Sequence, residues 1–172
     1  MTYHLYADDT QLFQEFSLTD NTSPEIAIRK MERCVSIRQW MKTNMLKLND
    51  DKTEILIIRP KSANQHLLPK SVKIGNTNVT PNTHARNLGV TFDFNMSLER
   101  HVTNISRTPY YHLYSIGRIR RYLEQGHTKQ LMHALVISRI DCCNNLLNGL
   151  SVALVEKLQR VQNAYARLCQ QS

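Results

Sequence analysis

The sequence predicts an α+β fold, with short β-hairpins and one helix over residues 1 to 94 and helices over residues 95 to 172. In the first part, apolar and polar residues alternate between turn signals, whereas in the second part apolar residues recur three and four positions apart. The charge also divides the chain. Residues 1 to 99 carry twelve Lys and Arg against eleven Asp and Glu, but residues 100 to 172 carry ten against three. Such a basic segment suits contact with a polyanion.

The first hairpin is expected from Leu5 to Phe13, where two short strands meet at Asp8 and Asp9. Adjacent carboxylates repel each other unless a cation lies between them, and a hard divalent cation with oxygen ligands is the usual solution. The pair is therefore a candidate half-site for Mg²⁺. A solvated acidic turn is the more common meaning of a bare Asp-Asp pair.

A helix is expected to begin at Ser23-Pro24-Glu25, because Ser can cap a helix and Pro can occupy its first position. It should fray near Thr43-Asn44. Apolar residues at helical spacing should form its buried face: Ile28, Met31, Val35, Trp40 and Met41.

Further strand-and-turn patterns follow this helix. Residues 46 to 49 and Thr53 to Ile58 are expected strands on either side of an Asp50-Asp51 turn. Residues 72 to 79 should form two short strands about Gly75-Asn76, and residues 85 to 93 should form another hairpin.

Helices are expected from about Asn95 onward, with a break near Thr108-Pro109 because proline disfavours helix in the preceding residue. The next helix should run from Lys129 to about Ile140. Its inward side chains should be Leu131, Leu135 and Val136. A last helix, capped by Ser151, should bury Leu154, Leu158, Val161, Tyr165 and Leu168.

A basic and aromatic segment precedes the Lys129 helix and contains Arg118, Arg120, Arg121 and Tyr122. Arginines beside tyrosines suit phosphate contacts combined with stacking on sugars or exposed bases. These residues are therefore candidates for nucleic-acid binding. Three arginines on a solvated helix face would give the same pattern.

The four cysteines show no C-x-x-C spacing, so reduced thiols are expected. A zinc site that combines Cys142 and Cys143 with His127 or His133 is an alternative. The apolar runs are too short to cross a bilayer, and no basic-then-apolar leader opens the chain. An intracellular protein without membrane contact is expected.

Several of these segments resemble reverse transcriptases of non-LTR (LINE-type) retrotransposons, over nearly the whole chain. Tyr6-Ala7-Asp8-Asp9 matches their Tyr-x-Asp-Asp box, and Trp40-Met41-x-x-Asn44-x-Leu46-Lys47-Leu48-Asn49-x-x-Lys52-Thr53-Glu54 looks like the segment that follows it. Leu88-Gly89-Val90 is similar to the primer-grip hairpin, although a plain hairpin fits these residues equally well.

The later helices carry two further matches. Residues 138 to 147 resemble the S-R-L-D-Y-C-N-x-L-L signature that follows the palm, with Cys142 at the position usually held by Tyr. Residues 158 to 168 also match the family.

The resemblance implies the C-terminal half of a polymerase palm at residues 1 to 94 and a thumb-like region at residues 95 to 172. It implies RNA-directed DNA synthesis with Mg²⁺ or Mn²⁺, an RNA template, a DNA primer and deoxynucleotide triphosphates. Asp8 would be the principal metal ligand and Asp9 a supporting one. Lys52 would be the general acid for the leaving pyrophosphate. The residues that would contact the nucleotide or primer are Tyr6, Ala7, Leu88, Gly89 and Val90.

The same resemblance implies that parts of the enzyme are missing. A two-metal site needs a further aspartate from an earlier palm strand, and the family also has fingers, so both are expected N-terminal to Met1. The chain is therefore expected to be inactive alone and to depend on the missing N-terminal part as a partner. The alternatives are a non-catalytic nucleic-acid-binding module and a non-functional relic. A nuclear or cytoplasmic location follows only from the resemblance.

Overall fold

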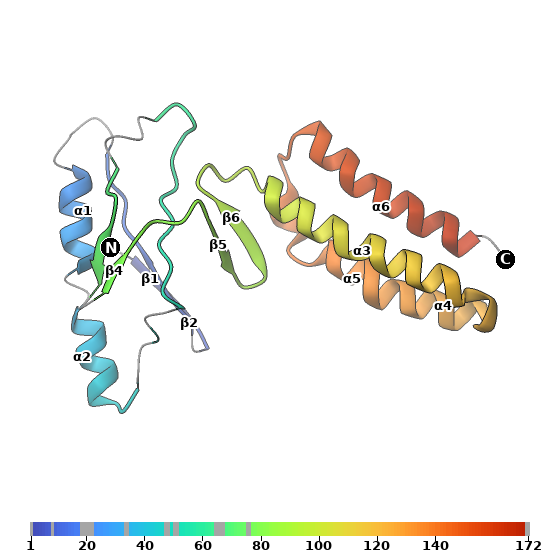
Figure 1. Ribbon diagram of the computed structural model, residues 1–172, viewed down its shortest axis with the longest axis horizontal. Coiled ribbons are helices and arrows are strands. Elements are labelled where there is room, and N and C mark those ends of the chain that lie inside the picture. Colours follow the sequence, from blue (N-terminus) through green and yellow to red (C-terminus); the bar gives the residue numbers. More distant parts are fainter. Residues whose placement is uncertain are drawn as a thin grey trace. The chain divides into compact units, whose positions relative to one another are not determined.

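The computed structural model describes residues 2–7, 9–17, 23–32, 35–46, 49, 52–63, 68–74 and 77–170. In these residues, helices accompany three two-stranded sheets, which confirms the expected α+β class (Figure 1). The chain divides into two compact units, Met1–Ala85 and Arg86–Ser172. The expected palm and thumb regions divide after residue 94 and not after residue 85. Those regions are defined by their roles in a polymerase, so they stay a prediction.

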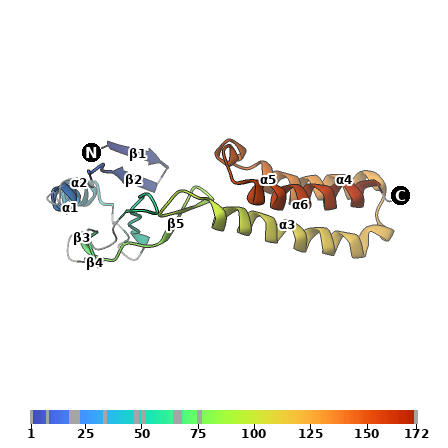
Figure 2. The same cartoon turned by 90° about the horizontal axis from the view of Figure 1, so that it is seen from above.

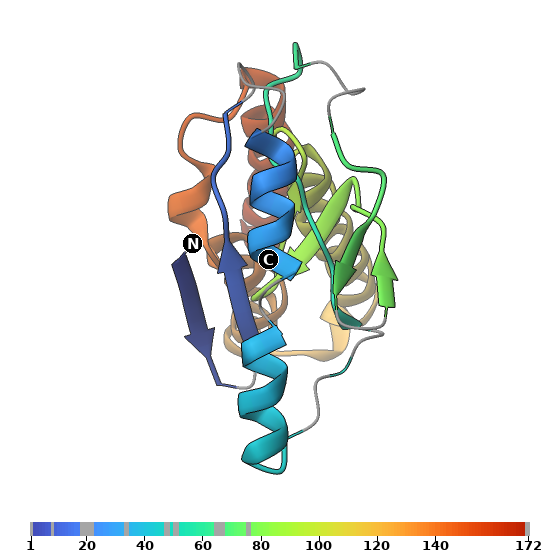
Figure 3. The ribbon, with the colours of Figure 1, turned by 90° about the vertical axis from the view of Figure 1, so that its left-hand side faces the viewer.

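The first hairpin forms where the sequence predicts it. Strands β1 (Thr2–Tyr6) and β2 (Asp9–Phe13) pair antiparallel (Figure 3). Their register places Tyr6 opposite Asp9 across a two-residue loop. Ala7, the first loop residue, has a φ of 52°, which is the left-handed conformation that tight hairpin loops require. Asp8, the second loop residue, lies outside the described residues.

Helix α1 (Ser23–Glu32) begins at the predicted Ser-Pro-Glu signal, and helix α2 (Val35–Thr43) follows it. Pro24 and Ala27 are buried on α1, which contacts strand β3 (Val72–Ile74). Trp40, however, is 60% exposed, so its predicted burial is wrong. Helical spacing identifies a face but does not reveal whether another element covers it. The side chain of Val35 lies outside the described part.

The predicted strand from Thr53 to Ile58 is wrong. This segment makes one isolated parallel bridge, Leu56 to Asn82, and the Asn82 amide donates to the Ile55 carbonyl at 2.7 Å. A strand requires a partner that offers repeated donors and acceptors, and one bridge does not supply a ladder. The expected strand over residues 46 to 49 includes positions 47 and 48, which are outside the described residues.

Two more hairpins are confirmed. β3 pairs antiparallel with β4 (Thr77–Val79), with Val72 opposite Val79. Strands β5 (His84–Asn87) and β6 (Val90–Asp93) form the last sheet. Their loop residues Leu88 and Gly89 have φ of 46° and 87°, the pair of positive values that defines a type I′ turn.

Helix α3 (Glu99–Ile119) is continuous through Pro109, so the predicted break near Thr108-Pro109 is wrong. Proline removes a helical N–H and costs about 3 kcal/mol in an exposed helix interior. Pro109 is instead among the fully buried side chains, on the same helix as the buried Val102 and Leu113. Packing of this face offsets the lost hydrogen bond.

The next helical stretch begins at Gln125, four residues before the predicted Lys129. It comprises α4 (Gln125–Met132), the π-turn η4 (His133–Ile137) and α5 (Ser138–Asp141). Thr128, Met132, Val136 and Ile140 are its buried side chains, whereas Leu131 is 37% exposed. The inward placement of Leu131 is therefore wrong, and that of Val136 is confirmed. Leu135, also expected inward, is partly buried.

Helix α6 (Val152–Gln170) begins after Ser151, whose carbonyl accepts the amides of Leu154 and Val155. It buries Leu158 and Val161, as predicted. Figure 2 shows α3, α4, α5 and α6 packed along one another. Their shared core contains Val102, Leu113, Ile116, Met132, Val136, Ile140, Leu158 and Val161.

Candidate functional site

The acidic hairpin holds the residues of the Tyr-x-Asp-Asp box. The β1–β2 register places Tyr6 directly opposite Asp9, and both residues are exposed. The structure therefore brings these two predicted site residues together at the loop end of one hairpin. Asp8, the predicted principal ligand, lies outside the described residues, and its role stays a prediction.

Residues of the types that bind metals do not cluster in the part of the chain that the structure describes. No group of three or more His, Cys, Asp and Glu residues lies close enough there to hold a metal ion. The combination of Cys142 and Cys143 with His127 or His133 is thus not assembled among described residues. Of the two predicted ligands, Asp9 is the described one, and its exposed carboxylate supplies the hard oxygen donors that Mg²⁺ prefers.

The remaining predicted residues of the polymerase site are described one by one. Lys52 is exposed, and its amide donates to the Asn49 carbonyl at 3.2 Å. Leu88 and Gly89 form the exposed tip of the β5–β6 hairpin, whereas Val90 is buried within its own unit. Their contacts with nucleotide or primer stay predictions.

The second unit carries an open groove with a volume of ≈ 510 Å³, which we call the tyrosine–arginine groove. Its lining residues are Tyr111, Tyr114, Ser115, Arg118, Ile119, Arg121 and Tyr122. The guanidinium of Arg118 lies 5.9 Å from the Tyr114 ring centroid, and that of Arg121 lies 4.7 Å from the Tyr122 centroid. Both distances are within the range of cation–π attraction.

Arg120 does not belong to this groove. Its Nη1 donates to the Leu168 carbonyl at 3.2 Å, near the C-terminal end of α6. A cation at this end also complements the helix dipole. Of the four predicted nucleic-acid-binding residues, the structure therefore gathers Arg118, Arg121 and Tyr122, and places Arg120 in a contact between helices.

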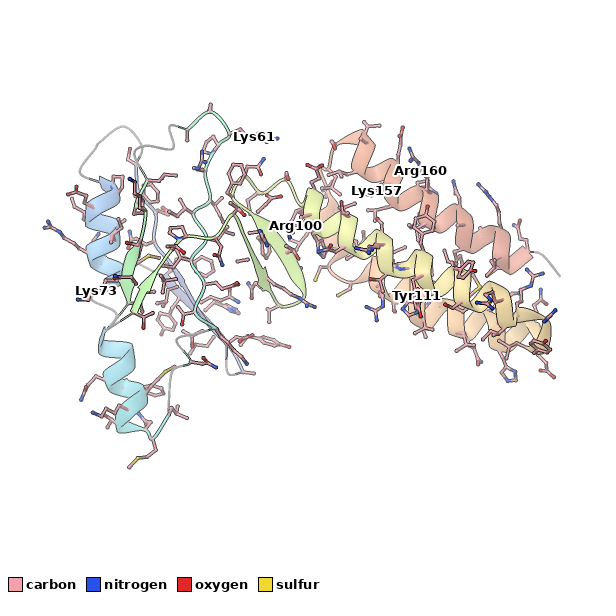
Figure 4. The ribbon with its side chains drawn as sticks, in the orientation of Figure 1. Lys61, Lys73, Arg100, Tyr111, Lys157 and Arg160 are labelled. Carbon is pink, nitrogen blue, oxygen red and sulfur yellow. The ribbon has the colours of Figure 1, made fainter. Side chains whose placement is uncertain are left out.

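Tyr111 and Tyr114 line the groove but were absent from the predicted set. Residues 111, 114 and 118 are three and four positions apart on α3 and therefore share a face, and Tyr122 follows in the short 3₁₀ helix Arg120–Tyr122. This spacing was visible in the sequence, where the two tyrosines were assigned to apolar contacts. Figure 4 shows Tyr111 projecting from α3.

Two other cations of the helical unit, Lys157 and Arg160, have partners. The Nζ of Lys157 donates to the Thr103 hydroxyl at 2.9 Å, and Arg160 lies 3.7 Å from the Glu156 carboxylate. Both project from α6 in Figure 4. The groove arginines differ, because their guanidinium groups lie over aromatic rings.

A buried histidine lies where β6 meets α3. The Thr91 amide donates to the Nδ1 of His101 at 3.4 Å, and Nε2 of His101 has no hydrogen-bond partner among the described residues. Burial lowers the pKa of His101, because removal from water penalises the charged imidazolium. The side chain is therefore held neutral.

Comparison of the chain with protein-family models, with curated proteins and with solved structures found no match. No helix in the described ranges is long and apolar enough to cross a membrane.

Proposed function

We propose that this chain is a portion of a non-LTR-type reverse transcriptase that contributes the Asp8-Asp9 pair to two-metal nucleotidyl transfer and does not catalyse alone. The observation that carries the proposal is the hairpin that places Tyr6, the first residue of the Tyr-Ala-Asp-Asp sequence, opposite the exposed Asp9, its last residue. The ordered motifs that follow along the chain add support.

Each residue of the proposed site has a chemical role. Asp8 and Asp9 would hold Mg²⁺ or Mn²⁺, which when bound would activate the primer 3′-hydroxyl and stabilise charge on the departing pyrophosphate. Lys52 is an exposed ammonium that could donate a proton to the leaving oxygen. The substrates would be deoxynucleotide triphosphates, with an RNA template and a DNA primer. The further carboxylate that such a site requires would come from a polypeptide segment outside these 172 residues.

Primer extension on an RNA template tests both parts of the proposal. The purified chain with Mg²⁺ should give no extension, and addition of a separately produced polypeptide that holds the fingers and the N-terminal half of the palm of a LINE-type enzyme, without its Tyr-x-Asp-Asp box, should restore it. Asp8→Asn or Asp9→Asn should then reduce the restored rate by at least about 100-fold, since each removes a metal-binding charge. Glu15→Gln is the matched control, because Glu15 is exposed and lies outside the acidic pair.

Two results would contradict this proposal. Robust extension by the chain alone would refute the claim that it is inactive. Restored activity that survives both aspartate substitutions would refute the catalytic role of the pair.

A second candidate function, a non-catalytic nucleic-acid-binding module, is favoured by the tyrosine–arginine groove. Three exposed tyrosines and two guanidinium groups line one groove, and this combination can stack on bases and contact phosphates. Fluorescence anisotropy with labelled RNA and DNA should detect salt-dependent binding by the whole chain.

Substitutions separate the two candidates. Arg118→Ala with Arg121→Ala should weaken binding about tenfold or more and reduce the salt slope by about 2, because each phosphate contact contributes about one unit to that slope. Asp8→Asn and Asp9→Asn should leave affinity unchanged. The control is Arg160→Ala, whose guanidinium pairs with Glu156. Unchanged affinity in the double arginine variant would eliminate the groove as the binding site.

A further inference from the structure

Cys142 and Cys143 lie in the turn that ends helix α5. The Cys142 amide donates to the Ser138 carbonyl at 3.2 Å, and the Cys143 carbonyl accepts the Leu146 amide at 2.9 Å. The backbone angles are φ −60° and ψ 119° at Cys142, and φ 61° and ψ 28° at Cys143. These values are close to those of the two central residues of a type II turn. The turn is thus held by hydrogen bonds on both sides.

This turn brings the two thiols together. Neighbouring side chains of an extended chain point to opposite faces, yet here the two Sγ atoms are 3.9 Å apart. Cys142 is exposed and Cys143 is half-exposed. Both sulfur atoms therefore lie at the surface and close to each other.

The sulfur separation matches one edge of a thiolate coordination shell. A soft ion with tetrahedral thiolate ligands at about 2.3 Å has neighbouring sulfur atoms about 3.8 Å apart. A disulfide requires sulfur atoms at about 2.05 Å and so a large approach from the observed 3.9 Å. The thiols are better placed to share an ion than to bond to each other.

We propose that Cys142 and Cys143 form a vicinal dithiol that chelates a soft, thiophilic metal or metalloid ion through both sulfur atoms. The remaining coordination positions are filled by ligands from solution, since the described residues supply no third ligand. Soft thiolate ligands select ions of this class over Mg²⁺ or Ca²⁺. The site does not depend on the proposed polymerase or nucleic-acid-binding function.

Phenylarsine oxide is a suitable probe because its reaction requires two neighbouring thiols. Two S–H bonds break and two As–S bonds form, while the oxide oxygen leaves with both protons as water. The oxidation states of arsenic and sulfur do not change, so no oxidant is needed.

Intact-mass measurement of the native chain tests the proposal. One phenylarsenic group should bind per chain, resist an excess of monothiol and be released by a 1,2-dithiol. Cys142→Ser and Cys143→Ser should each reduce occupancy at least tenfold. Cys169→Ser is the matched control, because the Cys169 sulfur lies beside the Met132 sulfur, 4.0 Å away, and belongs to no thiol pair in the described chain. Cys34→Ser is a second control.

A second variant and a second probe cover misfolding of the serine variants. Cys143→Gly removes the thiol and suits the positive φ of this position, so the turn should remain intact. Titration with Cd²⁺ should give a sulfur-to-metal ultraviolet band in the unsubstituted chain and none in Cys143→Gly. Absence of both the arsenic adduct and the Cd²⁺ band in the native unsubstituted chain would overturn the proposal. Retention of either signal in Cys143→Gly would also overturn it.

Discussion

The two compact units differ in how their described residues are stabilised. In the helical unit, buried side chains from α3, α4, η4, α5 and α6 form one continuous core. In the N-terminal unit, the described buried residues are Pro24, Ala27 and Val72, and strand β1 is exposed along its entire length. The β1–β2 hairpin therefore depends mainly on backbone pairing, whereas the helical unit depends on side-chain packing.

This difference also separates the two candidate sites. The acidic pair belongs to the unit with few buried side chains, and the tyrosine–arginine groove lies on a helix whose other face is in the core. Tyr3 and Leu5, at 71% and 61% exposed, leave the acidic hairpin with apolar surface on β1. A hairpin of this kind is suited to a partner that covers it, whereas the groove can be presented by its own unit.

The largest expected effect is in the helical core. Met132 is fully buried, so Met132→Ala should lower the free energy of unfolding by about 2–5 kcal/mol, through lost burial and the cavity left behind. Urea unfolding followed by circular dichroism measures this change. The control is Tyr3→Ala on exposed β1, which should change stability by less than about 0.5 kcal/mol. Equal effects of the two substitutions would contradict the contrast between the units.

A smaller effect is expected at the turn between β6 and α3. The Ser97 hydroxyl donates to the Asp93 carboxylate at 2.6 Å, and the Ser97 amide donates to the same carboxylate at 2.7 Å. Ser97→Ala removes the hydroxyl bond to Asp93 and the 3.3 Å bond that the hydroxyl oxygen accepts from the Glu99 amide, so a loss of about 1.5 kcal/mol is expected in the same unfolding assay. Thr43→Ala, which removes an exposed hydroxyl bond to Gln39 in α2, should cost less. If Ser97→Ala costs no more stability than Thr43→Ala, the partly buried hydroxyl of Ser97 does not stabilise the protein more than the exposed hydroxyl of Thr43.

The β5–β6 turn should respond in opposite directions at its two positions. Leu88 has a φ of 46°, so Leu88→Asn should raise the free energy of unfolding by about 1 kcal/mol, because Asn tolerates the left-handed region better than Leu does. Gly89→Ala should destabilise by about the same amount at φ 87°, although its Cβ would meet nothing within 4 Å. Thermal unfolding measures both changes. Stabilisation by Gly89→Ala would contradict the assigned turn.

The smallest expected effect is a pH dependence, because it concerns one group. The unfolded chain binds a proton at His101 near its ordinary pKa of 6.5, whereas burial lowers the pKa in the folded chain. The contribution of the neutral His101 to the free energy of unfolding should therefore be fully present above pH 6.5, and it should be lost as the pH falls from there toward the pKa of His101 in the folded chain. His101→Gln should flatten this part of the stability–pH curve, and the exposed His133→Gln should not. An unchanged curve in His101→Gln would exclude His101 as the cause.

Local patterns predicted much of the fold. Turn residues at positions 75–76 and 88–89 predicted hairpins that the structure contains, and the Ser-Pro-Glu signal predicted the start of α1. Other predictions were wrong because tertiary contacts, and not the local pattern, decided the structure. Pro109 lies inside α3 because its face is buried, and Thr53 to Ile58 lacks the ladder partner that a strand needs. Trp40 and Leu131 have helical spacing, but spacing does not show which face is covered.

The candidate sites divide in the same way. The sequence by itself determined the order of the acidic pair, the hairpins and the basic segment, because these depend on residues close together along the chain. Only the tertiary structure separated Arg118 and Arg121, which lie over tyrosine rings, from Arg120, which binds the end of α6. Only it oriented the Cys142 and Cys143 thiols toward each other. The Arg120 contact joins segments 48 residues apart, and the orientation of the thiols depends on backbone angles that a residue pattern does not specify.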